Sequence, residues 1–350
     1  MISNNKIVFV SPGLSGGGAE RVASILSNYL CSNGYEVHFI SVYNKEREYK
    51  LHDEIKYYDT ETNKKKTVGF LYRSIKIRNI IKNVNPRIII SFVMPELIMT
   101  QLSFKNTIVS LRNDPSNLST KEKILFYFSM MLSNKIVFQT KDVLDYYSNS
   151  FNKKSYIIHN PISDNLPYWN KKNHNNRFIT AARLEQQKNI YMMIDAFIES
   201  KLYEQDYILE IYGEGSLKRD LQNYVELNKM DNYVYLKGRS RNIHNIMSNS
   251  FIFLLSSNYE GISNSMIEAL AIGLPCICTD CPPGGTREFI NDMDNGILVP
   301  VGDKNKMAKA MIMLVTDNNL VDKISDRSIK IREELDVSTI GGIWESLIKM

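Results

Sequence analysis

Short apolar runs alternate with amphipathic helical patterns from one end of the chain to the other. The run Lys6–Ser11 predicts a buried strand, and a glycine-rich loop leads from it to a helix that begins at Ala19. Gly34 closes this helix, and Tyr35–Tyr43 predicts the next strand. A strand, a glycine loop, a helix and a second strand are typical of the start of a doubly wound domain, so the expected fold class is α/β.

A polar stretch divides this alternation into two halves. Ser163–Asn176 is rich in Asn and Lys and predicts a linker. The further strands expected before it are Arg87–Phe92, Asn106–Leu111, Lys135–Gln139 and Ser155–Ile158. The strands expected after it are Arg177–Ala181, Tyr207–Tyr212, Tyr233–Leu236 and Phe251–Leu255, and the helices are Ile190–Ser200 and Leu217–Leu227. The sequence therefore predicts two α/β domains.

The composition agrees with a globular chain that has two cores. The 350 residues are 43% hydrophobic and 23% charged, which is enough for two domains. The longest apolar runs, such as Ile124–Leu132, are shorter than the ~20 residues that a membrane-spanning helix needs. The N-terminal run Ile7–Val10 is interrupted at once by Ser11–Gly13, so no secretory signal is expected. These features favour the cytoplasm.

The four cysteines are too few for a disulfide scaffold in a chain of this length. Cys276, Cys278 and Cys281 lie close together, which suggests a metal site as one interpretation. No fourth ligand lies near them in the sequence, and their spacing alternates along an expected strand. The other interpretation, that they pack a buried strand, is favoured.

The net charge of +5 is divided unevenly between the halves. Residues 1–163 carry 22 Lys and Arg against 13 Asp and Glu, a net charge of +9, and residues 164–350 carry 21 against 25, a net charge of −4. Four cations follow Lys64–Lys66 on helical spacing: Arg73, Lys76, Arg78 and Lys82. This run fits either peripheral contact with an anionic membrane or an ordinary solvated helix face. No nucleic-acid-binding motif accompanies it.

The stretch Ser256–Gly285 carries the strongest chemical signal. It follows an apolar run and leads into a helical pattern for which Ser263 or Asn264 is the expected N-cap. Gly273 and Pro275 are expected to end this helix. The first-turn N–H groups of a helix have no intrahelical partner and the helix dipole adds positive potential, so this terminus predicts an anion site.

Two carboxylates flank the predicted anion site. Glu260 precedes the helix and Glu268 lies in its second turn, and helical side chains lean towards the N-terminus, so both can reach the same opening. Carboxylates hydrogen-bond hydroxyl groups well, which suits a ligand with a central diphosphate and a polyol at each end, such as a nucleotide-sugar. Two surface glutamates on an ordinary strand–helix unit are the alternative.

Two cations follow the expected strand Arg177–Ala181. Arg183 and Lys188 lie at its carboxyl end, where open α/β sheets bind ligands. Together they can neutralise a diphosphate.

Several fixed offsets in this half hold at once. They are carried by Glu260-Gly261-Ile262-Ser263-Asn264, Glu268-Ala269-Leu270-Ala271 and Gly273-Leu274-Pro275. Together they resemble the signature of retaining GT-B glycosyltransferases of the glycogen-synthase-like superfamily, glycosyltransferase family 4. Cys281-Pro282-Pro283-Gly284-Gly285 and Arg287-Glu288 are similar to the version found in bacterial capsule, exopolysaccharide and lipopolysaccharide transferases.

The resemblance implies a GT-B fold, in which two Rossmann-like doubly wound domains enclose a cleft. It implies that residues 1–163 bind the acceptor, that residues 164–335 bind the nucleotide-sugar, and that a helix in 336–350 crosses back to the first domain. The implied activity is metal-independent hexosyl transfer from a nucleoside diphosphate sugar, with a UDP-sugar favoured and no cofactor. The implied acceptor is a lipid-linked bacterial surface glycan at the inner face of the cell membrane.

The resemblance also assigns roles to residues. The catalytic group would be Glu260, Arg183 and Lys188. The donor-binding group would be Gly213, Gly261, Ile262, Ser263, Asn264 and Glu268, although Gly213-Glu214-Gly215 also fits a plain turn. The residues facing the acceptor and the cleft would be Gly17, Gly18 and Arg112. No metal ligand is expected.

Three features qualify these assignments. Many family members have a histidine in the first domain that contacts the donor sugar, whereas this chain has Arg112 in that region, which could serve an anionic acceptor or form a salt bridge at a loop mouth. His159 is expected to cap a strand. Asp292-Met293-Asp294 has the spacing of a metal-binding D-x-D motif, but the sequence around it predicts a turn before a strand.

Two alternative functions stay open. One is a GT-B epimerase that acts on a nucleoside diphosphate N-acetylhexosamine, which would need acid–base residues and no acceptor. The other is a catalytically silent GT-B subunit that binds the donor or a partner transferase. The pair of glutamates with its glycine and proline tail favours transfer over the epimerase. The presence of Arg183, Lys188, Glu260 and Glu268 argues against the silent subunit, and the missing histidine keeps that alternative open.

Overall fold

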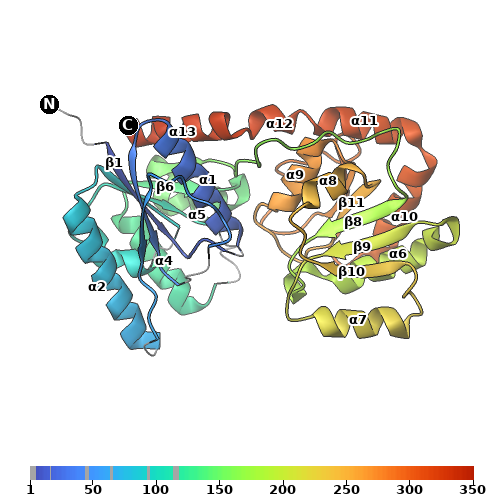
Figure 1. Ribbon diagram of the computed structural model, residues 1–350, viewed down its shortest axis with the longest axis horizontal. Coiled ribbons are helices and arrows are strands. Elements are labelled where there is room, and N and C mark those ends of the chain that lie inside the picture. The colour runs from blue at the N-terminus through green and yellow to red at the C-terminus, as the bar shows by residue number, and fades with distance from the viewer. Residues whose placement is uncertain (1–4, 16, 44–46, 64–65, 93–94, 113–117) are drawn as a thin grey trace. The chain divides into compact units, whose positions relative to one another are not determined.

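The computed structural model describes residues 5–350 except 16, 44–46, 64–65, 93–94 and 113–117. Gly16 and Lys64–Lys65, which belong to two of the predicted motifs, therefore lie outside the described residues. The chain forms two compact units (Figure 1). Unit 1 comprises Met1–Pro161 and Val337–Met350, and unit 2 comprises Ile162–Asp336.

Unit 1 is built on a parallel sheet, seven-stranded in the described residues, in the order β3-β2-β1-β4-β5-β6-β7. Its strands are β1 (Lys6–Ser11), β2 (Glu36–Ser41), β3 (Lys56–Asp59), β4 (Ile88–Ser91), β5 (Thr107–Ser110), β6 (Lys135–Phe138) and β7 (Ser155–Ile157). The inner strands consist almost entirely of buried residues, because helices cover both faces of a parallel sheet. Continuous apolar runs in the sequence therefore predict these strands. The edge strand β3 has the polar sequence KYYD, and the sequence analysis does not predict it.

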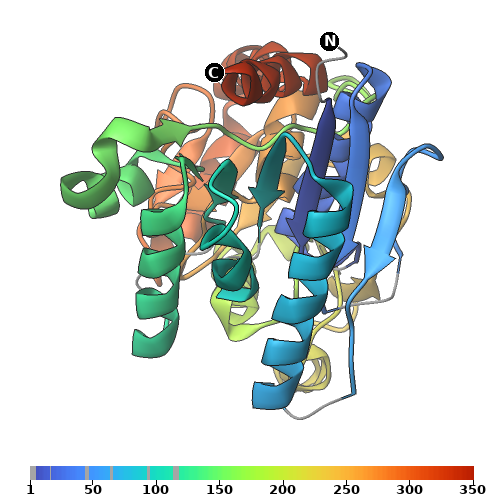
Figure 2. The ribbon, with the colours of Figure 1, turned by 90° about the vertical axis from the view of Figure 1, so that its left-hand side faces the viewer.

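The helices of unit 1 lie on both faces of this sheet. They are α1 (Gly18–Ser32), α2 (Lys66–Val84), α3 (Ile98–Gln101), α4 (Thr120–Leu132), α5 (Lys141–Phe151) and α13 (Val337–Lys349). Right-handed crossovers in this strand order place α1 on one face and α2 to α5 on the other. Figure 2 shows α2, α3 and α4 in front of the strands, with α3 between the other two helices. Ile77 and Ile81 of α2 pack on Val8 and Val10 of β1.

The C-terminal helix α13 packs on unit 1 beside α1. Trp344 is fully buried, and its ring centroid lies 6.4 Å from that of Phe92. Gly341 lies against the ring of Tyr29 so closely that a Cβ atom there would approach Tyr29 Cδ1 to 2.5 Å. The last helix is therefore part of the core of the first unit.

Two helices of unit 1 expose apolar side chains on one face. These side chains are Val68, Leu71 and Ile75 on α2 and Ile124, Tyr127, Phe128 and Met131 on α4. They recur every three or four residues, which places those of each helix on a single stripe. Among the described residues, no helix is both long enough and apolar enough to cross a bilayer.

Unit 2 is built on a second parallel sheet, six-stranded in the described residues, in the order β10-β9-β8-β11-β12-β13. Its strands are β8 (Arg177–Ala181), β9 (Ile208–Tyr212), β10 (Val234–Gly238), β11 (Ile252–Leu255), β12 (Cys276–Thr279) and β13 (Ile297–Val299). Its helices are α6 (Ile190–Ser200), α7 (Lys218–Leu227), α8 (Ile243–Ser248), α9 (Asn264–Ile272), α10 (Lys304–Thr316), α11 (Asn318–Ser328) and α12 (Ile331–Glu334). The strand order places α6 and α7 on one face and α8 and α9 on the other.

The predicted linker Ser163–Asn176 begins beside the boundary between the two units, at Pro161 and Ile162, and packs against unit 2. Trp169 is buried, its Nε1 donates to Ser250 O at 2.7 Å, and its ring stacks on His174 at 5.5 Å. One buried tryptophan therefore anchors this Asn- and Lys-rich segment to the core of unit 2.

Candidate functional site

The candidate site lies at the carboxyl edge of the unit 2 sheet. The strand order reverses between β8 and β11, because the helix after β8 covers one face and the helix after β11 covers the other. In open α/β sheets such a switch point is where ligands bind. Two loops meet there, Ala182–Asn189 after β8 and Ser256–Ser263 after β11, and we call them the switch-point loops.

Hydrogen bonds join the two switch-point loops. Asn258 N donates to Gln187 O at 2.8 Å, and Gln187 Nε2 donates to Tyr259 O at 3.0 Å. Asn189 Nδ2 donates to Asn258 Oδ1 at 2.9 Å, and Ser256 Oγ donates to Lys188 O at 2.8 Å. The loops are therefore one preformed surface, and the side chains they carry are held in fixed relative positions.

Lys188 and Glu260 form an ion pair between these loops. Lys188 Nζ donates to Glu260 Oε2, and the side chains are only 9% and 12% exposed. Ser257 Oγ donates to the same carboxylate oxygen at 3.3 Å, and Glu260 N donates to Pro282 O at 2.8 Å. The sequence analysis gives these two residues separate partners, the diphosphate and the sugar. The structure brings them into direct contact.

Arg183 lies on the solvent side of the same surface. Its side chain is exposed, and Nη2 donates to Gln187 Oε1 at 3.1 Å. Gln187 is the residue that bonds Tyr259, so the guanidinium is tied to both switch-point loops through one amide. Arg183 is thus the accessible cation of the site, whereas Lys188 is the buried one.

Two glycine pairs let backbone segments approach each other closely here. Gly213 has φ +142°, and a Cβ atom there would lie 1.8 Å from Ala182 O. A Cβ atom at Gly215 would lie 2.3 Å from Leu184 O, and one at Gly285 would lie 1.3 Å from Gly261 O. Gly213 and Gly215 therefore seat the loop after β9 on the loop after β8. Gly285 seats the glycine-proline tail on Gly261.

Helix α9 begins at the position that the sequence predicts. Its N-cap is Ser263 and its C-cap is Gly273, which has φ +85°. The Ser263 side chain makes no capping hydrogen bond, and its Oγ lies 3.2 Å from Ser265 Oγ. Ile262 and Ser263 are buried and Asn264 opens the helix, so the first turn faces the switch-point loops with its dipole directed at them.

Glu268 is held by a residue that the sequence analysis missed. Glu268 is 3% exposed, and its Oε2 lies 3.0 Å from Nε2 of His244 on α8. His244 itself is part-exposed, so it joins the buried carboxylate to the surface. The only sequence signal was a histidine shortly after an expected strand, at the edge where ligands bind.

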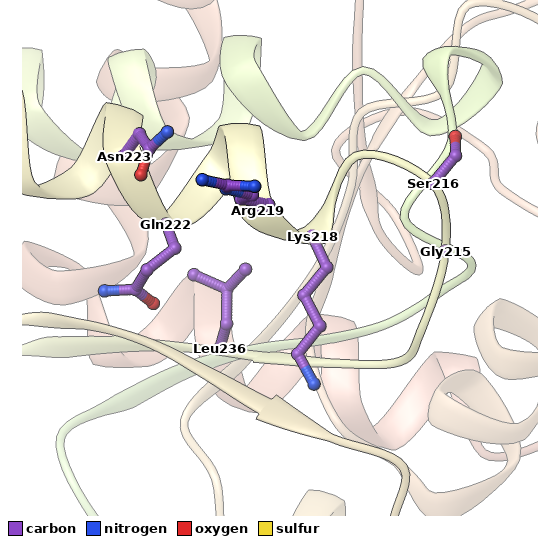
Figure 3. A pocket seen from close by; sticks show the side chains of 7 residues that line it. All are labelled: Gly215, Ser216, Lys218, Arg219, Gln222, Asn223 and Leu236. Carbon is purple, nitrogen blue, oxygen red and sulfur yellow. The ribbon is translucent and has the colours of Figure 1, made fainter.

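A shallow pocket of about 480 Å³ lies next to this region, between α7 and β10. Figure 3 shows its lining: Gly215 and Ser216 from the loop before α7, Lys218, Arg219, Gln222 and Asn223 from α7, and Leu236 from β10. None of the predicted site residues lines it. Lys218 Nζ is paired with Glu214 Oε1 at 2.9 Å.

In unit 1, Arg112 lies just after β5 at the carboxyl edge of its sheet. Its Nε donates to Ser110 Oγ at 2.9 Å, Nη1 donates to Asn160 Oδ1, and Cζ lies 5.0 Å from the Phe92 ring centroid. Nη2 is buried without a hydrogen-bond partner, and the described residues contain no carboxylate paired with this guanidinium. Burial lowers the pKa of Arg112 to about 9. The salt bridge that the sequence left open is not seen among these residues, and the arrangement favours an anion.

Gly17, Gly18 and His159 lie at the ends of secondary-structure elements of unit 1. Gly17 is the N-cap of α1 and Gly18 its first residue, next to the first-turn Glu20. His159 Nδ1 lies 2.9 Å from Gln139 O, at the end of β7 where the sequence expects a cap.

The D-x-D-like segment forms the predicted turn before β13. Asp292 Oδ1 accepts from Leu298 N at 2.9 Å, and Asp294 Oδ1 contacts Arg327. Both aspartate side chains therefore have partners within unit 2.

The three clustered cysteines, Cys276, Cys278 and Cys281, are buried in and after β12. Burial raises the pKa of each thiol, to about 11 for Cys281. They pack the core behind the site, as the sequence analysis favours.

Comparison with known proteins finds similarity to glycosyltransferases. Residues 175–317, which lie within unit 2, match the family model for glycosyl transferases group 1. The chain is 25% identical over 360 residues to an α-1,4-N-acetyl-D-galactosaminyltransferase of Campylobacter jejuni serotype O:2, with 98% of each chain covered. The name of that relative gives its acceptor as a glycan on PP-undecaprenol.

Two further comparisons extend over the whole chain. An uncharacterised glycosyltransferase of Haemophilus influenzae is 25% identical over 347 residues, with 95% of this chain and 97% of that protein covered. The crystal structure of Anabaena HepE in complex with UDP and glucose superimposes with a TM-score of 0.84 at 16% identity, covering 98% of this chain and 99% of that one. The chain therefore has the GT-B fold, carries a group 1 glycosyltransferase domain, and is a glycosyltransferase.

Proposed function

We propose that the chain is a retaining, metal-independent transferase that moves a hexose or N-acetylhexosamine from a nucleoside diphosphate sugar, preferably a UDP-sugar, to a lipid-linked bacterial surface glycan. The observation that carries this proposal is the Lys188–Glu260 pair at the switch point of the group 1 domain. It places a buried cation and a carboxylate near the N-terminus of α9 at the carboxyl edge of the sheet.

In this proposal the site acts by electrostatic stabilisation. The bond between the anomeric carbon and the diphosphate oxygen breaks. A bond to an acceptor hydroxyl forms on the same face of the sugar, and the departing diphosphate takes the proton of that hydroxyl. Arg183, Lys188 and the N–H groups near Ser263 and Asn264 stabilise the charge on the departing diphosphate. These groups are preformed, so no metal ion or cofactor is needed.

Glu260 and Glu268 take the two polyol ends of the donor. Glu260 orients the sugar, and Lys188 holds the carboxylate in place for that task. Glu268 accepts hydrogen bonds from the ribose hydroxyls, with His244 fixing its orientation. Their positions support this division. Glu260 precedes α9 and is paired with Lys188, one of the two cations proposed to bind the diphosphate, whereas Glu268 lies in the second turn of α9.

The acceptor side of the proposal rests on unit 1. The lipid-linked acceptor named for the Campylobacter relative carries a diphosphate, and Arg112 offers a buried guanidinium nitrogen without a hydrogen-bond partner. The exposed apolar stripes of α2 and α4 and the cations of α2 suit peripheral contact with an anionic membrane at its cytoplasmic face. We therefore propose that the enzyme acts at the cytoplasmic surface of the membrane that holds its lipid-linked acceptor.

The two alternatives predict different products. An epimerase would return an altered donor and need no acceptor, and a silent subunit would bind the donor without turnover. Incubation of the purified chain with radiolabelled UDP-sugars and extracted membrane lipid separates them. Label that enters the lipid fraction supports transfer, an epimerised nucleotide-sugar supports the first alternative, and unchanged donor with full binding supports the second.

A further inference from the structure

Three metal-ligating side chains of different types meet at the edge of unit 1. Cys31 lies in the last turn of α1, and His52 and Glu54 lie in the connection that leads to β3. Cys31 Sγ is 3.6 Å from His52 Nδ1, and the ligand atoms of all three residues lie within 4.8 Å of one another. The thiol is buried, whereas His52 and Glu54 are exposed, so the group is open to an ion from solvent.

Helix α1 holds the connection in place. Ser24 Oγ and Asn28 Nδ2 both donate to Lys50 O at 3.0 Å, and Asn28 Oδ1 accepts from His52 N at 2.8 Å. The backbone that carries His52 is thus fixed to the same helix that carries Cys31. A preformed arrangement of this kind lowers the ordering cost of binding an ion.

We propose that Cys31 Sγ, His52 Nδ1 and the Glu54 carboxylate bind a Zn²⁺ ion, with water as the fourth ligand. Zn–S and Zn–N distances of about 2.3 and 2.0–2.1 Å at a tetrahedral angle require a sulfur–nitrogen separation of about 3.5–3.6 Å. The Cys31–His52 separation of 3.6 Å meets this requirement. The exposed Glu54 carboxylate offers an oxygen within 4.8 Å of both of these atoms. Thiolate and imidazole together select Zn²⁺ over Mg²⁺ or Ca²⁺.

The tautomer of His52 is compatible with this assignment. Glu54 N donates to His52 Nδ1 at 3.3 Å, so Nδ1 is the unprotonated ring nitrogen, and zinc would replace this long contact at its lone pair. A thiol must lose its proton to bind zinc, so the apparent zinc affinity falls as the pH is lowered.

The site is structural and separate from the transfer chemistry. Cys31 lies at the C-terminal end of α1, just before β2 begins, and His52 and Glu54 lie just before β3 begins. All three are at the amino edge of the sheet, opposite to the edge that carries Arg112. A bound ion would clamp the last turn of α1 to the start of the edge strand β3. This clamp goes beyond the proposed transferase activity.

Zinc titration of the full chain after treatment with a chelator tests the proposal. One equivalent of Zn²⁺ should bind in competition with a chromophoric chelator, and Co²⁺ should give the thiolate charge-transfer band and the tetrahedral visible spectrum of a sulfur-ligated site. Zinc at a hundredfold excess over its dissociation constant should raise the unfolding temperature of unit 1 by roughly 5–10 °C. Cys31→Ser should abolish the charge-transfer band, and His52→Ala should lose tight binding.

Asp53→Asn is the matched control, because it removes an exposed carboxylate next to Glu54 that is outside the cluster. It should bind zinc like the unaltered chain. Zinc that binds equally well to the Cys31→Ser and His52→Ala variants is adventitious and overturns the proposal, as does a chain that binds none. His52 is on the surface, so its variant gives an answer even if Cys31→Ser fails to fold. Tight binding without any rise in unfolding temperature would contradict the structural role.

Discussion

Lys188 and Glu260, which lie 72 residues apart in the sequence, form a buried ion pair that joins the loop after β8 to the loop after β11. Removal of one partner from such a pair leaves an uncompensated buried charge, which costs about 3–5 kcal/mol of stability. Substitutions at these positions must therefore separate catalysis from folding. Glu260→Gln does so best, because the amide has the same shape and its oxygen can still accept from Lys188.

Arg183→Ala should weaken binding of the nucleotide. Arg183 is the exposed cation of the switch-point loops, and a charge-assisted contact to phosphate contributes about 1.5–3 kcal/mol, which is roughly a ten- to hundredfold change in affinity. Calorimetric titration with UDP measures the effect, and Arg78→Ala on α2 of unit 1 is the matched arginine control. If Arg183→Ala binds UDP as tightly as the control does, Arg183 is not part of the site.

Glu268→Ala should raise the KM for the donor and change kcat less. The ribose contact is present in the ground state and in the transition state alike, so its loss weakens binding uniformly. His244→Ala should show the same signature in weaker form, because it frees the carboxylate without removing it. Steady-state kinetics with varied donor concentration measure both. A fall in kcat at unchanged KM for either variant would contradict the ribose assignment.

Arg112→Ala should raise the KM for a diphosphate-linked acceptor by roughly ten- to hundredfold, since the lost contact is charge-assisted. A neutral acceptor analogue that carries the same glycan without the diphosphate should be used almost equally well by the variant and the unaltered chain. Arg112→Lys should recover part of the difference because it keeps the charge. An equal loss with both acceptors would show that Arg112 supports the fold of the β5 edge and does not bind an anion.

Much of the fold follows from the sequence because both sheets are parallel and buried. Continuous apolar runs marked β1, β8 and β11 to within a residue or two. The edge strand β3 was not predicted because its sequence, KYYD, contains no apolar run. The polar composition of Ser163–Asn176 predicted the boundary between the units, whereas the packing of Trp169 on unit 2 depends on contacts that are distant in the sequence.

The site was predicted residue by residue, but the contacts between those residues were not. The first turn of α9 and the glutamates before and within this helix were recognisable because capping residues and spacing are local. Lys188 is paired with a residue of the loop after β11, and Glu268 with a residue of α8, and only the fold brings these partners together. Arg112 was noticed as an unusual residue, whereas its contact with Asn160, 48 residues away, required the structure.

Turnover at moderate temperature should survive EDTA, because the charge on the diphosphate is met by side chains and a helix terminus. The same treatment should lower the unfolding temperature of unit 1 if Cys31, His52 and Glu54 bind zinc, so activity and stability respond differently. Loss of turnover that Mg²⁺ or Mn²⁺ restores would contradict the metal-independent mechanism. It would also make Asp292 and Asp294 candidate metal ligands, although they contact Leu298 and Arg327 in the structure.

The most direct test of the account is the kinetics of Glu260→Gln with a donor and a lipid-linked acceptor. If the carboxylate stabilises the positive charge that develops on the sugar ring as the glycosidic bond breaks, it contributes more in the transition state than in the ground state. The account predicts that kcat falls by ~10²-fold while UDP affinity changes little, when both are measured below the unfolding temperature of the variant, which falls because Lys188 loses its counter-charge. Glu226→Gln on α7, an exposed carboxylate outside the site, should behave like the unaltered chain. Normal transfer of sugar by Glu260→Gln would contradict the role given to the switch-point loops.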